Sequence, residues 1–278
     1  MTGRTPVLTF SEDVIVLKIT ILASGSKGNA THLEIGSLRV LIDCGISLRQ
    51  IQTRMIEQGL SLDRLDAVFL THEHVDHVFG LAAVSHKFGM PIYMTEGTMR
   101  NLSRKISEGL DSQSIRIIRP GDVIQLDSVL VKPLPAFHDA LEPCGYKFVE
   151  SGKSLVYLTD TGYYPQAAFD AIRNADVYVI EANHDPEMLL DSDRPWMLKR
   201  RILDDEGHLS NEDSAFLIAN VLGEKTRKIF LAHRSQECNT KEKSMEVYQK
   251  VFSEQGLIFA DYHVECAEQD VPMPMTEV

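Results

Sequence analysis

Four side chains that can ligate a metal ion are concentrated in one short stretch of the sequence, THEHVDH. The stretch follows a short apolar run and precedes a helical pattern, so we expect it to connect a strand to a helix. In extended backbone His72 and His74 point to the same side, whereas Asp76 and His77 open the helix and point to a neighbouring position. Imidazole nitrogens and carboxylate oxygens are ligands of zinc and related ions, so the stretch predicts the beginning of two adjacent metal sites.

Three further candidate ligands stand at the ends of predicted strands elsewhere in the chain, and they are His138, Asp160 and His233. A polar group at the end of an apolar strand is well placed for a functional site, because the buried strand fixes its position. Any one of the three, taken alone, could be an ordinary turn residue. Together with the histidine-rich stretch they provide enough ligands to complete two metal sites.

The elements that must position these ligands alternate along the chain. Nine runs rich in β-branched residues predict strands, at residues 16–22, 31–35, 39–43, 67–70, 115–118, 129–134, 154–158, 176–180 and 228–231. Helical patterns cover residues 47–57, 75–88, 165–173, 211–222 and 241–254, and Ser210 and Thr240 are predicted N-caps. The alternation predicts an α/β chain, and no tandem repeat or linker divides it. Periodicity alone does not predict how the sheets and helices are layered.

The ligand series, in this order, resembles that of the metallo-β-lactamase superfamily. Seven short motifs further resemble the WalJ/YycJ group of that superfamily: SGSKGN (24–29), DCG (43–45), HDA (138–140), TDTG (159–162), EANHD (181–185), GHLSN (207–211) and AHRS (232–235). The resemblance implies a single domain over residues 1–278 with a four-layer αββα sandwich fold.

The resemblance also implies how the ligands divide between two divalent metal ions, zinc or manganese. The residues that would hold the first ion are His72, His74 and His138. Those that would hold the second are Asp76, His77 and His233, with Asp160 bridging. Asp43 resembles the acidic residue beneath such sites, where it would orient a ligand histidine through the ring N–H. The structural alternative for Asp43 is a turn-capping aspartate.

Two neighbouring ions can share one hydroxide, formed because they lower the pKa of a bound water, and can stabilise a displacement at phosphorus. The ligand set therefore predicts a hydrolase. The resemblance implies a metal-dependent phosphodiesterase, namely a DNA exonuclease that works from 5′ to 3′. An alternative is a small-molecule hydrolase acting on a thioester, a lactone or a cyclic phosphodiester, because it would use the same ligands. A metal-bound, non-catalytic scaffold is a third possibility, although the ligand set is complete.

A second group of polar residues favours phosphodiester chemistry. His208 precedes the helix that Ser210 would cap, and a helix N-terminus beside a histidine suits phosphate oxygens. We expect His208 to contact the scissile phosphate or to protonate the leaving oxygen, the alternative being a histidine bonded to loop backbone. Glu181 and His184 are expected to form a similar acid–orienter pair, and Asp76 is counted as catalytic as well as a ligand.

A basic run at residues 194–201 could hold a nucleic-acid backbone. Within it Trp196, Lys199, Arg200 and Arg201 are predicted substrate-binding residues, with the indole as a stacking platform. The alternative is a solvated helix face that balances nearby aspartates. Lys27, in the glycine-rich SGSKGN turn, could also meet a phosphate, although the turn lacks the spacing of a nucleotide-binding P-loop.

The overall charge limits the kind of nucleic-acid contact. The net charge is −12, so contact with DNA must be local, because proteins that grip DNA over a wide face are usually basic. The four cysteines form no CxxC pair, which suits a reducing compartment, and the first 25 residues lack the pattern of a signal peptide or a membrane span. These features predict a cytoplasmic enzyme without membrane contact, and they leave its oligomeric state open.

Overall fold

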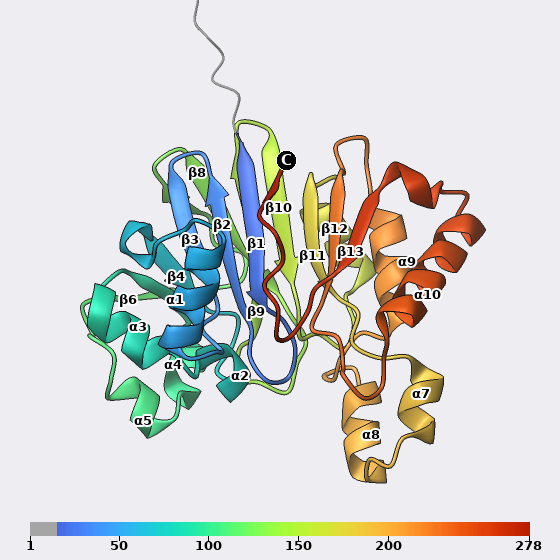
Figure 1. Cartoon of the computed structure of the whole chain (residues 1–278), viewed down its shortest axis with the longest axis horizontal. Helices are drawn as coiled ribbons and strands as arrows, with labels where there is room; N and C mark the ends of the chain where they lie inside the picture. The colour runs from blue at the N-terminus through green and yellow to red at the C-terminus, as the bar shows by residue number, and fades with distance from the viewer. Residues whose placement is uncertain (1–15) are drawn as a thin grey trace, which may run out of the picture.

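Two β-sheets of seven strands each face one another in the computed structural model, which describes residues 16–278. Helices cover the outer side of both sheets, so the order of layers is helix, sheet, sheet, helix (Figure 1). The predicted α/β fold with αββα layering is therefore confirmed. The N-terminal stretch from which we predicted that no signal peptide is present lies mostly outside the described residues.

The first sheet is built almost entirely from the N-terminal part of the chain. Its strands, in spatial order, are β14 (Thr276–Glu277), β1 (Leu17–Ala23), β2 (Ala30–Ile35), β3 (Leu38–Ile42), β4 (Ala67–Phe69), β5 (Ile92–Thr95) and β6 (Ile115–Ile118). Strands β3 to β6 are parallel, so their carboxyl ends meet at one edge of the sheet. The C-terminal strand β14 returns to pair with β1, which ties the two ends of the described chain together.

The second sheet has a similar organisation. In spatial order it contains β13 (His263–Cys266), β12 (Lys228–Ala232), β11 (Val177–Glu181), β10 (Lys153–Leu158), β9 (Cys144–Glu150), β8 (Val129–Pro135) and β7 (Ile124–Leu126). Strands β10 to β13 are parallel, whereas β7 to β10 form antiparallel hairpins. Its parallel strands also end at a common edge, where ligand-binding loops of α/β proteins usually lie.

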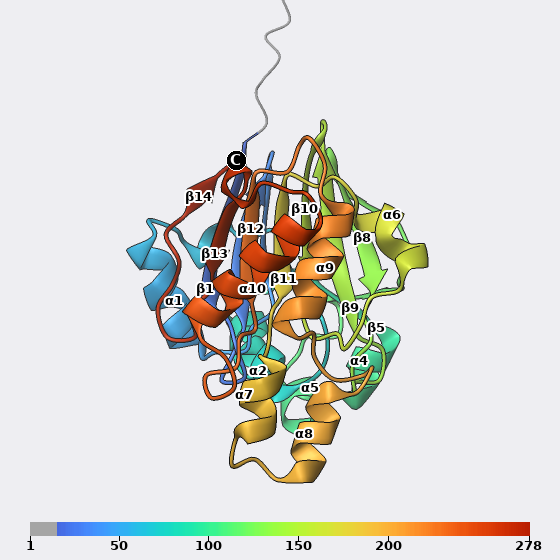
Figure 2. The ribbon, with the colours of Figure 1, turned by 90° about the vertical axis from the view of Figure 1, so that its right-hand side faces the viewer.

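The helices divide between the two outer faces. Those next to the first sheet are α1 (Leu48–Glu57), α2 (Val75–Val78), α3 (Leu81–Phe88), α4 (Glu96–Asn101) and α5 (Arg104–Ser107), with the 3₁₀ turn η1 (Leu62–Arg64). Those on the other side are α6 (Phe169–Ile172), α7 (Pro186–Asp191), α8 (Trp196–Leu203), α9 (Asn211–Val221) and α10 (Lys241–Glu254), with the 3₁₀ turns η2 (Gln166–Ala168) and η3 (Phe259–Asp261). Figure 2 shows α9 and α10 lying across the second sheet, while α7 and α8 project beyond its lower edge.

Three apolar cores hold these layers together. The inner core fills the space between the sheets with side chains such as Ile19, Phe69, Tyr146 and Phe230. The other two cores lie between each sheet and its helices. Because side chains alternate across a strand, each central strand contributes to an inner and an outer core, which explains why these strands are apolar on both faces. No helix within residues 16–278 has the length and apolar composition needed to cross a bilayer.

All nine predicted strands are present within one residue of their predicted ends, but five strands were not predicted. The unpredicted strands are β5, β7, β9, β13 and β14. The predicted helix 75–88 is wrong as one element, because it is interrupted after α2. There the backbone of Gly80 approaches Ile46 so closely that a Cβ would lie 2.2 Å from the Ile46 carbonyl oxygen. The predicted helix 165–173 is also reduced, to η2 and the single turn α6.

Candidate metal centre

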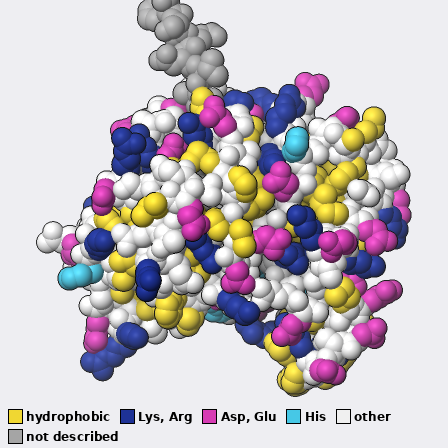
Figure 3. Space-filling model, viewed as in Figure 1, with side chains coloured by type: hydrophobic (Ala, Val, Ile, Leu, Met, Phe, Trp, Pro, Cys, Tyr) yellow, Lys and Arg dark blue, Asp and Glu magenta, His cyan; other side chains and the backbone are white. Residues whose placement is uncertain are grey.

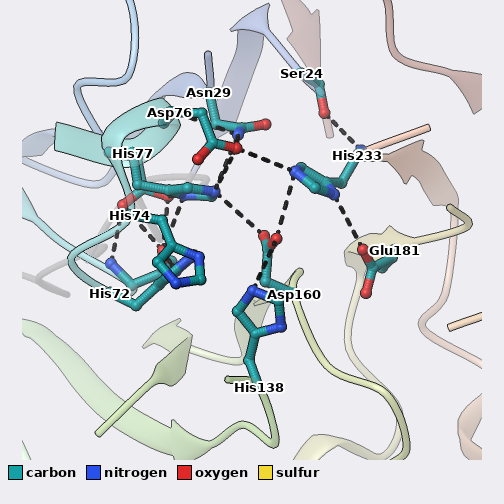
Figure 4. Close-up of polar contacts among 12 residues, drawn as sticks. Ser24, Asn29, His72, His74, Asp76, His77, His138, Asp160, Glu181 and His233 are labelled. Atoms are coloured by element: carbon teal, nitrogen blue, oxygen red, sulfur yellow. Dashed lines mark hydrogen bonds and ion pairs between the residues drawn. The ribbon is translucent and has the colours of Figure 1, made fainter. Parts of the chain in front are cut away.

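Loops at the carboxyl ends of four strands bring the candidate ligands to one place. The histidine-rich stretch follows β4, and the other three ligands, His138, Asp160 and His233, follow β8, β10 and β12. Figure 4 shows their side chains converging from these separate loops, with Asp160 between the histidines. The first sheet supplies one side of the cluster and the second sheet supplies the other, so the cluster lies where the edges of the two sheets meet.

The ligand atoms form overlapping groups in which all atoms lie within 4.8 Å of one another. Three of these groups contain only proposed ligands, namely His72/His74/His138, Asp76/His77/His233 and His72/His77/Asp160, and a fourth joins Asp160 and His233 to Glu181 and His208. The first two groups correspond to the two ion sites that the family resemblance implies. A carboxylate oxygen of Asp160 lies 3.4 Å from Nε2 of His77, and the other lies 3.3 Å from Nε2 of His233 and 3.9 Å from Nε2 of His138. Asp160 is thus placed where one carboxylate could bridge two ions.

The chemistry of the cluster fits divalent cations. Three buried ligand atoms lack a hydrogen-bond partner among the described residues, and they are Nε2 of His72, Nε2 of His233 and Oδ2 of Asp160. A buried polar atom without a partner is costly in free energy, and such atoms are uncommon in folded proteins. Buried nitrogen and carboxylate oxygen atoms without partners, each close to other ligand atoms, are what bound ions would satisfy.

Asp43 anchors one of these histidines from beneath. Its Oδ2 lies 2.8 Å from Nδ1 of His77, and the carboxylate also accepts hydrogen bonds from the backbone N–H and hydroxyl of Thr71. Because Nδ1 of His77 faces Asp43, Nε2 faces the cluster. Burial raises the pKa of Asp43, and the hydrogen bonds and charge of His77 oppose that shift. The structure therefore places Asp43 where it can fix the ring orientation of His77, while its contact with Thr71 also caps the turn.

Glu181 serves two histidines on the opposite side of the cluster. Its Oε1 lies 2.8 Å from Nδ1 of His208 and 3.1 Å from Nδ1 of His233. Its Oε2 accepts hydrogen bonds from the backbone N–H groups of Thr161 and Leu209. Burial alone would raise the pKa of Glu181, but His208 and His233 hold it well below its usual range. The carboxylate therefore orients both imidazole rings while remaining charged.

The expected pair of Glu181 with His184 does not form. Both ring nitrogens of His184 are buried without a hydrogen-bond partner among the described residues, because the Glu181 carboxylate is directed at His208 and His233 instead. His184 is also absent from the residues that line the cleft over the cluster. Burial lowers the pKa of His184 to about 4, so its ring is neutral at neutral pH. We therefore do not propose a catalytic role for His184.

The buried imidazoles and carboxylates of the cluster shift one another's pKa values in both directions. Burial and the neighbouring imidazoles of His77, His138 and His74 hold the pKa of His72 well below its usual value. His77 behaves in the opposite way, because Asp160, Asp43 and Asp76 outweigh its burial and raise its pKa. The pKa of His233 is likewise raised, to about 10, by Asp160, Asp76 and Glu181 against the effect of burial. The carboxylates thus favour positive charge at this point of the cluster.

The backbone of the site is unusual at three positions. Asp43, Asp160 and His233 have φ angles of 62°, 57° and 50°, in the left-handed region that side chains other than glycine seldom adopt. Such conformations persist where the surrounding structure imposes them, and they cluster at functional sites. Here each residue turns sharply as it leaves its strand, so its side chain is directed at the cluster. Gly45 allows the same packing, because a Cβ there would lie 1.5 Å from the carbonyl oxygen of Asp76.

The glycine-rich loop SGSKGN (24–29) packs against the cluster, and the sequence alone did not indicate this. Nδ2 of Asn29 lies 3.0 Å from Nε2 of His77, and its backbone N–H donates to the carbonyl oxygen of Asp76. The hydroxyl of Ser24 accepts a hydrogen bond from the backbone N–H of His233. Lys27 itself is exposed and is absent from the residues that line the cleft. The loop thus supports the second ligand group, Asp76/His77/His233, through Ser24 and Asn29.

A cleft of about 450 Å³ opens over the cluster. Its floor is formed by six of the candidate residues, namely His74, Asp76, His138, Asp160, His208 and His233. Its outer wall is formed by Arg194, Leu198, Arg201 and Ile202 from the segment around α8. In Figure 3 the lobe that carries α7 and α8 stands at the lower right, separated by a hollow from the rest of the molecule. The volume is in the range of ordinary ligand sites.

The basic run at 194–201 separates into residues that face the cleft and residues that do not. Arg201 lines it, and so does Arg194, which we had not selected as a site residue. Arg200 lies at a neighbouring shallow pocket, and Trp196 is exposed at the start of α8. Lys199 does not fit the predicted role, because its ammonium group is almost buried and donates to the carbonyl oxygens of Leu190 and Ser192. This residue holds the connection between α7 and α8.

Comparison with known proteins gives the class of this protein. A family model described as the Beta-lactamase superfamily domain matches residues 38–233, and the chain belongs to the metallo-β-lactamase superfamily. The solved metallo-β-lactamase fold protein YhfI from Bacillus subtilis superposes with a TM-score of 0.69 at 16% identity, covering 94% of this chain and 100% of that one. This structural likeness shows the shared fold.

Two relatives with named activities match nearly the whole chain. Exodeoxyribonuclease WalJ of Streptococcus pneumoniae is 38% identical over 266 residues, which is 95% of this chain and 99% of that protein. Exodeoxyribonuclease YycJ of Bacillus anthracis is 35% identical over 240 residues, covering 86% of this chain and 90% of that protein. The predicted resemblance to the WalJ/YycJ group is thereby confirmed.

Proposed function

We propose that this protein is a metal-dependent DNA exonuclease that hydrolyses phosphodiester bonds at a centre of two divalent ions, zinc or manganese. The relatives named as exodeoxyribonucleases match almost the full length of the chain. The observation that carries the proposal is the cluster itself, in which two groups of ligand atoms share Asp160 as a neighbour beneath an open cleft. We take residues 1–278 as one catalytic domain.

The proposed ligands of the first ion are His72, His74 and His138, and those of the second are Asp76, His77 and His233, with Asp160 shared. When bound, two such ions would act as Lewis acids and would lower the pKa of a bound water molecule towards neutrality. The resulting hydroxide is the nucleophile that phosphodiester hydrolysis needs. The chain contributes the orientation of the ligands. Asp43 fixes His77 and Glu181 fixes His233, each through Nδ1, so that both Nε2 atoms face the cluster.

His208 is the proposed proton donor to the leaving oxygen. Its ring packs between those of His138 and His233, with centroid distances of 4.9 and 5.2 Å, and its side chain reaches the cleft. Since Nδ1 of His208 faces Glu181, Nε2 is the atom available to the substrate. Glu181 thereby fixes the ring orientation in which Nε2 can donate a proton to the leaving oxygen. Glu181 acts through His208, and it is therefore a positioning residue.

The direct test is an assay of end-labelled DNA. Purified protein, stripped of metal and then supplied with Mn²⁺ or Zn²⁺, should release label from single- or double-stranded DNA, and EDTA should stop the release. Comparing 5′ and 3′ labels, and blocking either end with phosphorothioate linkages, determines the polarity, for which we propose 5′ to 3′. RNA of the same sequence tests the preference for DNA.

The control protein is the double variant Asp76→Ala/His77→Ala, which removes two proposed ligands of one ion. Release of label by this variant would indicate a contaminating nuclease. No metal-dependent release by the intact protein, together with turnover of a thioester, lactone or cyclic phosphodiester, would replace the proposal with a small-molecule hydrolase. All four cysteines are buried and free, which agrees with the reducing, cytoplasmic setting that we propose.

A further inference from the structure

The wall of the cleft opposite the metal ligands presents a regular arrangement of side chains. Leu198, Arg201 and Ile202 are three and four positions apart in α8, so they share one face of the helix. Arg194 stands four positions before Leu198, and all four residues line the cleft. Two cations therefore flank an apolar strip. They are seven positions apart in the chain, and Arg194 stands before the N-cap Pro195, so only Arg201 lies within the helix.

Each of the two arginines is held by a carboxylate from a loop that also carries a proposed metal ligand. Nε of Arg194 donates to Glu237 at 2.9 Å, and Glu237 stands four residues after His233. Nε of Arg201 donates to Oδ2 of Asp139, which directly follows His138. One guanidinium group is thus directed towards the loop of the second ion group, and the other towards the loop of the first. Both arginines stand on the same wall of the cleft, and their carboxylate partners belong to the loops of different ion groups.

These carboxylates compete with a nucleic acid for the same donors. Glu237 and Asp139 both belong to the rim of the cleft or of the pocket beside it. Glu237 is 71% exposed in its side chain, so its ion pair with Arg194 is of the kind that contributes little to stability. A phosphate offers an arginine the same bidentate geometry as a carboxylate. The Arg194–Glu237 pair can therefore be exchanged at small cost. Asp139 is less exposed, at 32%, and its Oδ1 also lies 3.3 Å from Nε2 of His138.

We propose that Arg194 and Arg201 bind the backbone phosphates on either side of the scissile bond, and that Glu237 and Asp139 hold these arginines in the free enzyme until the DNA displaces them. This inference rests on the proposed function and goes further in naming the residues that bind the DNA backbone. The two carboxylates compete with the DNA, since a strand binds only when its phosphates replace the carboxylates at the two arginines. Leu198 and Ile202 then face the sugar or base between the two phosphates.

The test measures binding of a single-stranded oligonucleotide with phosphorothioate linkages to the metal-loaded protein at several salt concentrations. Arg194→Ala should weaken binding about ten-fold, which corresponds to the loss of one charge-assisted contact. It should also reduce the slope of log affinity against log salt concentration by about 0.7, since each phosphate contact to a single strand contributes about that amount. Arg201→Ala should reduce the slope similarly.

Glu237→Gln provides the sharper readout, because it is expected to tighten DNA binding. Removing this carboxylate frees Arg194 and removes a negative charge from the path of the strand. The expected gain is about two- to five-fold at low salt, on the scale of an exposed ion pair. If the pair only holds α8 in place, the same substitution would instead weaken binding and lower the melting temperature, and the proposal would be overturned.

A matched control comes from α5, where Nε of the exposed Arg104 donates to Glu108 at 2.7 Å. Figure 1 shows α5 on the opposite side of the molecule from α8. Arg104→Ala and Glu108→Gln should change neither the affinity nor the salt slope. Hydrolysis of bis(p-nitrophenyl) phosphate should likewise be unchanged in Arg104→Ala and Glu108→Gln.

The outcomes separate this inference from the proposed function. If the intact protein degrades no DNA with any metal, the proposed function fails. The intact protein could degrade DNA normally while Arg194→Ala retains its affinity and salt slope. The proposed exonuclease would then stand, and the proposed binding of phosphates by Arg194 and Arg201 would be wrong. An equal loss of DNA affinity in Arg194→Ala and Arg104→Ala would also contradict the proposed phosphate binding by the two arginines, because it would show that only the net charge of the protein matters.

Discussion

Glu181 is the residue on which the proposed chemistry and the proposed metal binding depend together. One of its carboxylate oxygens contacts both His208 and His233, so a single buried charge orients the proposed proton donor and a proposed ligand. Two backbone N–H groups hold the other oxygen, which fixes the carboxylate in the plane that serves both rings. A substitution at Glu181 would therefore disturb both functions, whereas one at His208 separates them.

The His208→Ala variant should retain its metal ions and lose turnover. His208 is not among the ligands that we propose, and its removal leaves the contact of Glu181 with His233 in place. General acid catalysis typically contributes about 10²- to 10⁴-fold to the rate, so kcat on DNA should fall by that amount. Steady-state kinetics and metal analysis of the same sample provide the measurement. A variant that loses both metal and activity would contradict the assigned role.

Two buried histidines outside the proposed catalytic roles predict how stability depends on pH. Burial lowers the pKa of His32 and of His184 to about 4, whereas in the unfolded chain each would titrate near 6.5. Between these values the unfolded chain binds more protons than the folded one, so stability falls as the pH is lowered from 6.5 to 4. At pH 5 each histidine should lower the free energy of unfolding by about 2 kcal/mol relative to its value at pH 7.

Urea unfolding of the metal-free protein at pH 7 and pH 5 measures this effect. His184→Gln should lose less stability between the two pH values than the unsubstituted chain does. His86→Gln, at an exposed position in α3, serves as the control and should behave as the parent. An unchanged pH dependence in His184→Gln would show that its ring is not held neutral by burial.

At the scale of elements, the C-terminal segment controls the loop that supports the cluster. The side chain of Gln269 accepts from the backbone N–H of Lys27 and donates to the carbonyl oxygen of Gly28. Arg54 of α1 in turn donates to the carbonyl oxygens of Gln269 and Asp270, which fixes this segment against the first sheet. The position of the SGSKGN loop thus depends on residues more than 200 positions away.

Gln269→Ala should destabilise the protein by about 2 kcal/mol, because it leaves buried backbone groups of the loop without partners. It should also weaken metal binding by up to about ten-fold, since the loop acts on the ligands through Ser24 and Asn29. Thermal unfolding and competition with a chelator measure the two effects. Gln255→Ala, at an exposed position after α10, is the matched control. Unchanged metal affinity in Gln269→Ala would show that the loop does not support the ligands.

The elements that could be predicted are those whose pattern is local. Runs such as those of β1 and β12 are apolar and β-branched, and the packing of both faces explains their composition. Strand β9 begins with Cys144 and Gly145, and glycine is disfavoured in strands, so its start gives no clear signal, and β14 has only two residues. These strands form because their neighbours in the sheet supply the pairing. The pairing of β1 with β14 joins the two ends of the described chain, and no local pattern can indicate it.

The candidate ligands could be selected from the sequence because their types and spacing are restrictive. Their supports were harder to predict, since hydrogen bonds depend on direction. The motif EANHD contains an acid and a histidine three positions apart, but the backbone directs Glu181 away from His184. Likewise the charge of Lys199 suggested a phosphate contact, whereas two carbonyl oxygens take up its ammonium group. Gln269 lies in no motif, so no local pattern indicates its role.

At the scale of the whole molecule, each proposed ion joins the two halves of the sandwich. The first group takes His72 and His74 from the loop after β4 and His138 from the loop after β8, which belongs to the other sheet. The second group joins the same loop and its helix to His233 after β12. A bound ion would therefore act across the interface between the sheets as well as on the substrate.

Metal ions should consequently raise the melting temperature. A ligand that binds only the folded state at one hundred times its dissociation constant stabilises by about 2.7 kcal/mol. For a chain of this size that corresponds to roughly 5 to 10 °C, measured by thermal unfolding with Mn²⁺ or Zn²⁺ against EDTA. The Asp76→Ala/His77→Ala variant should show a smaller shift. Equal melting temperatures with metal and with EDTA would argue against ions that connect the two sheets.

The left-handed backbone at Asp43, Asp160 and His233 affects how any mutational survey of this enzyme must be designed. Alanine at these positions would remove the functional group and would also have to adopt a conformation that disfavours it by about 1–2 kcal/mol. Asparagine tolerates that conformation, so it changes the chemistry of the side chain with little distortion of the chain path. A survey that uses only alanine would therefore attribute to lost ligands a penalty that belongs to the peptide backbone, and the choice of replacement residue decides which of the two is measured.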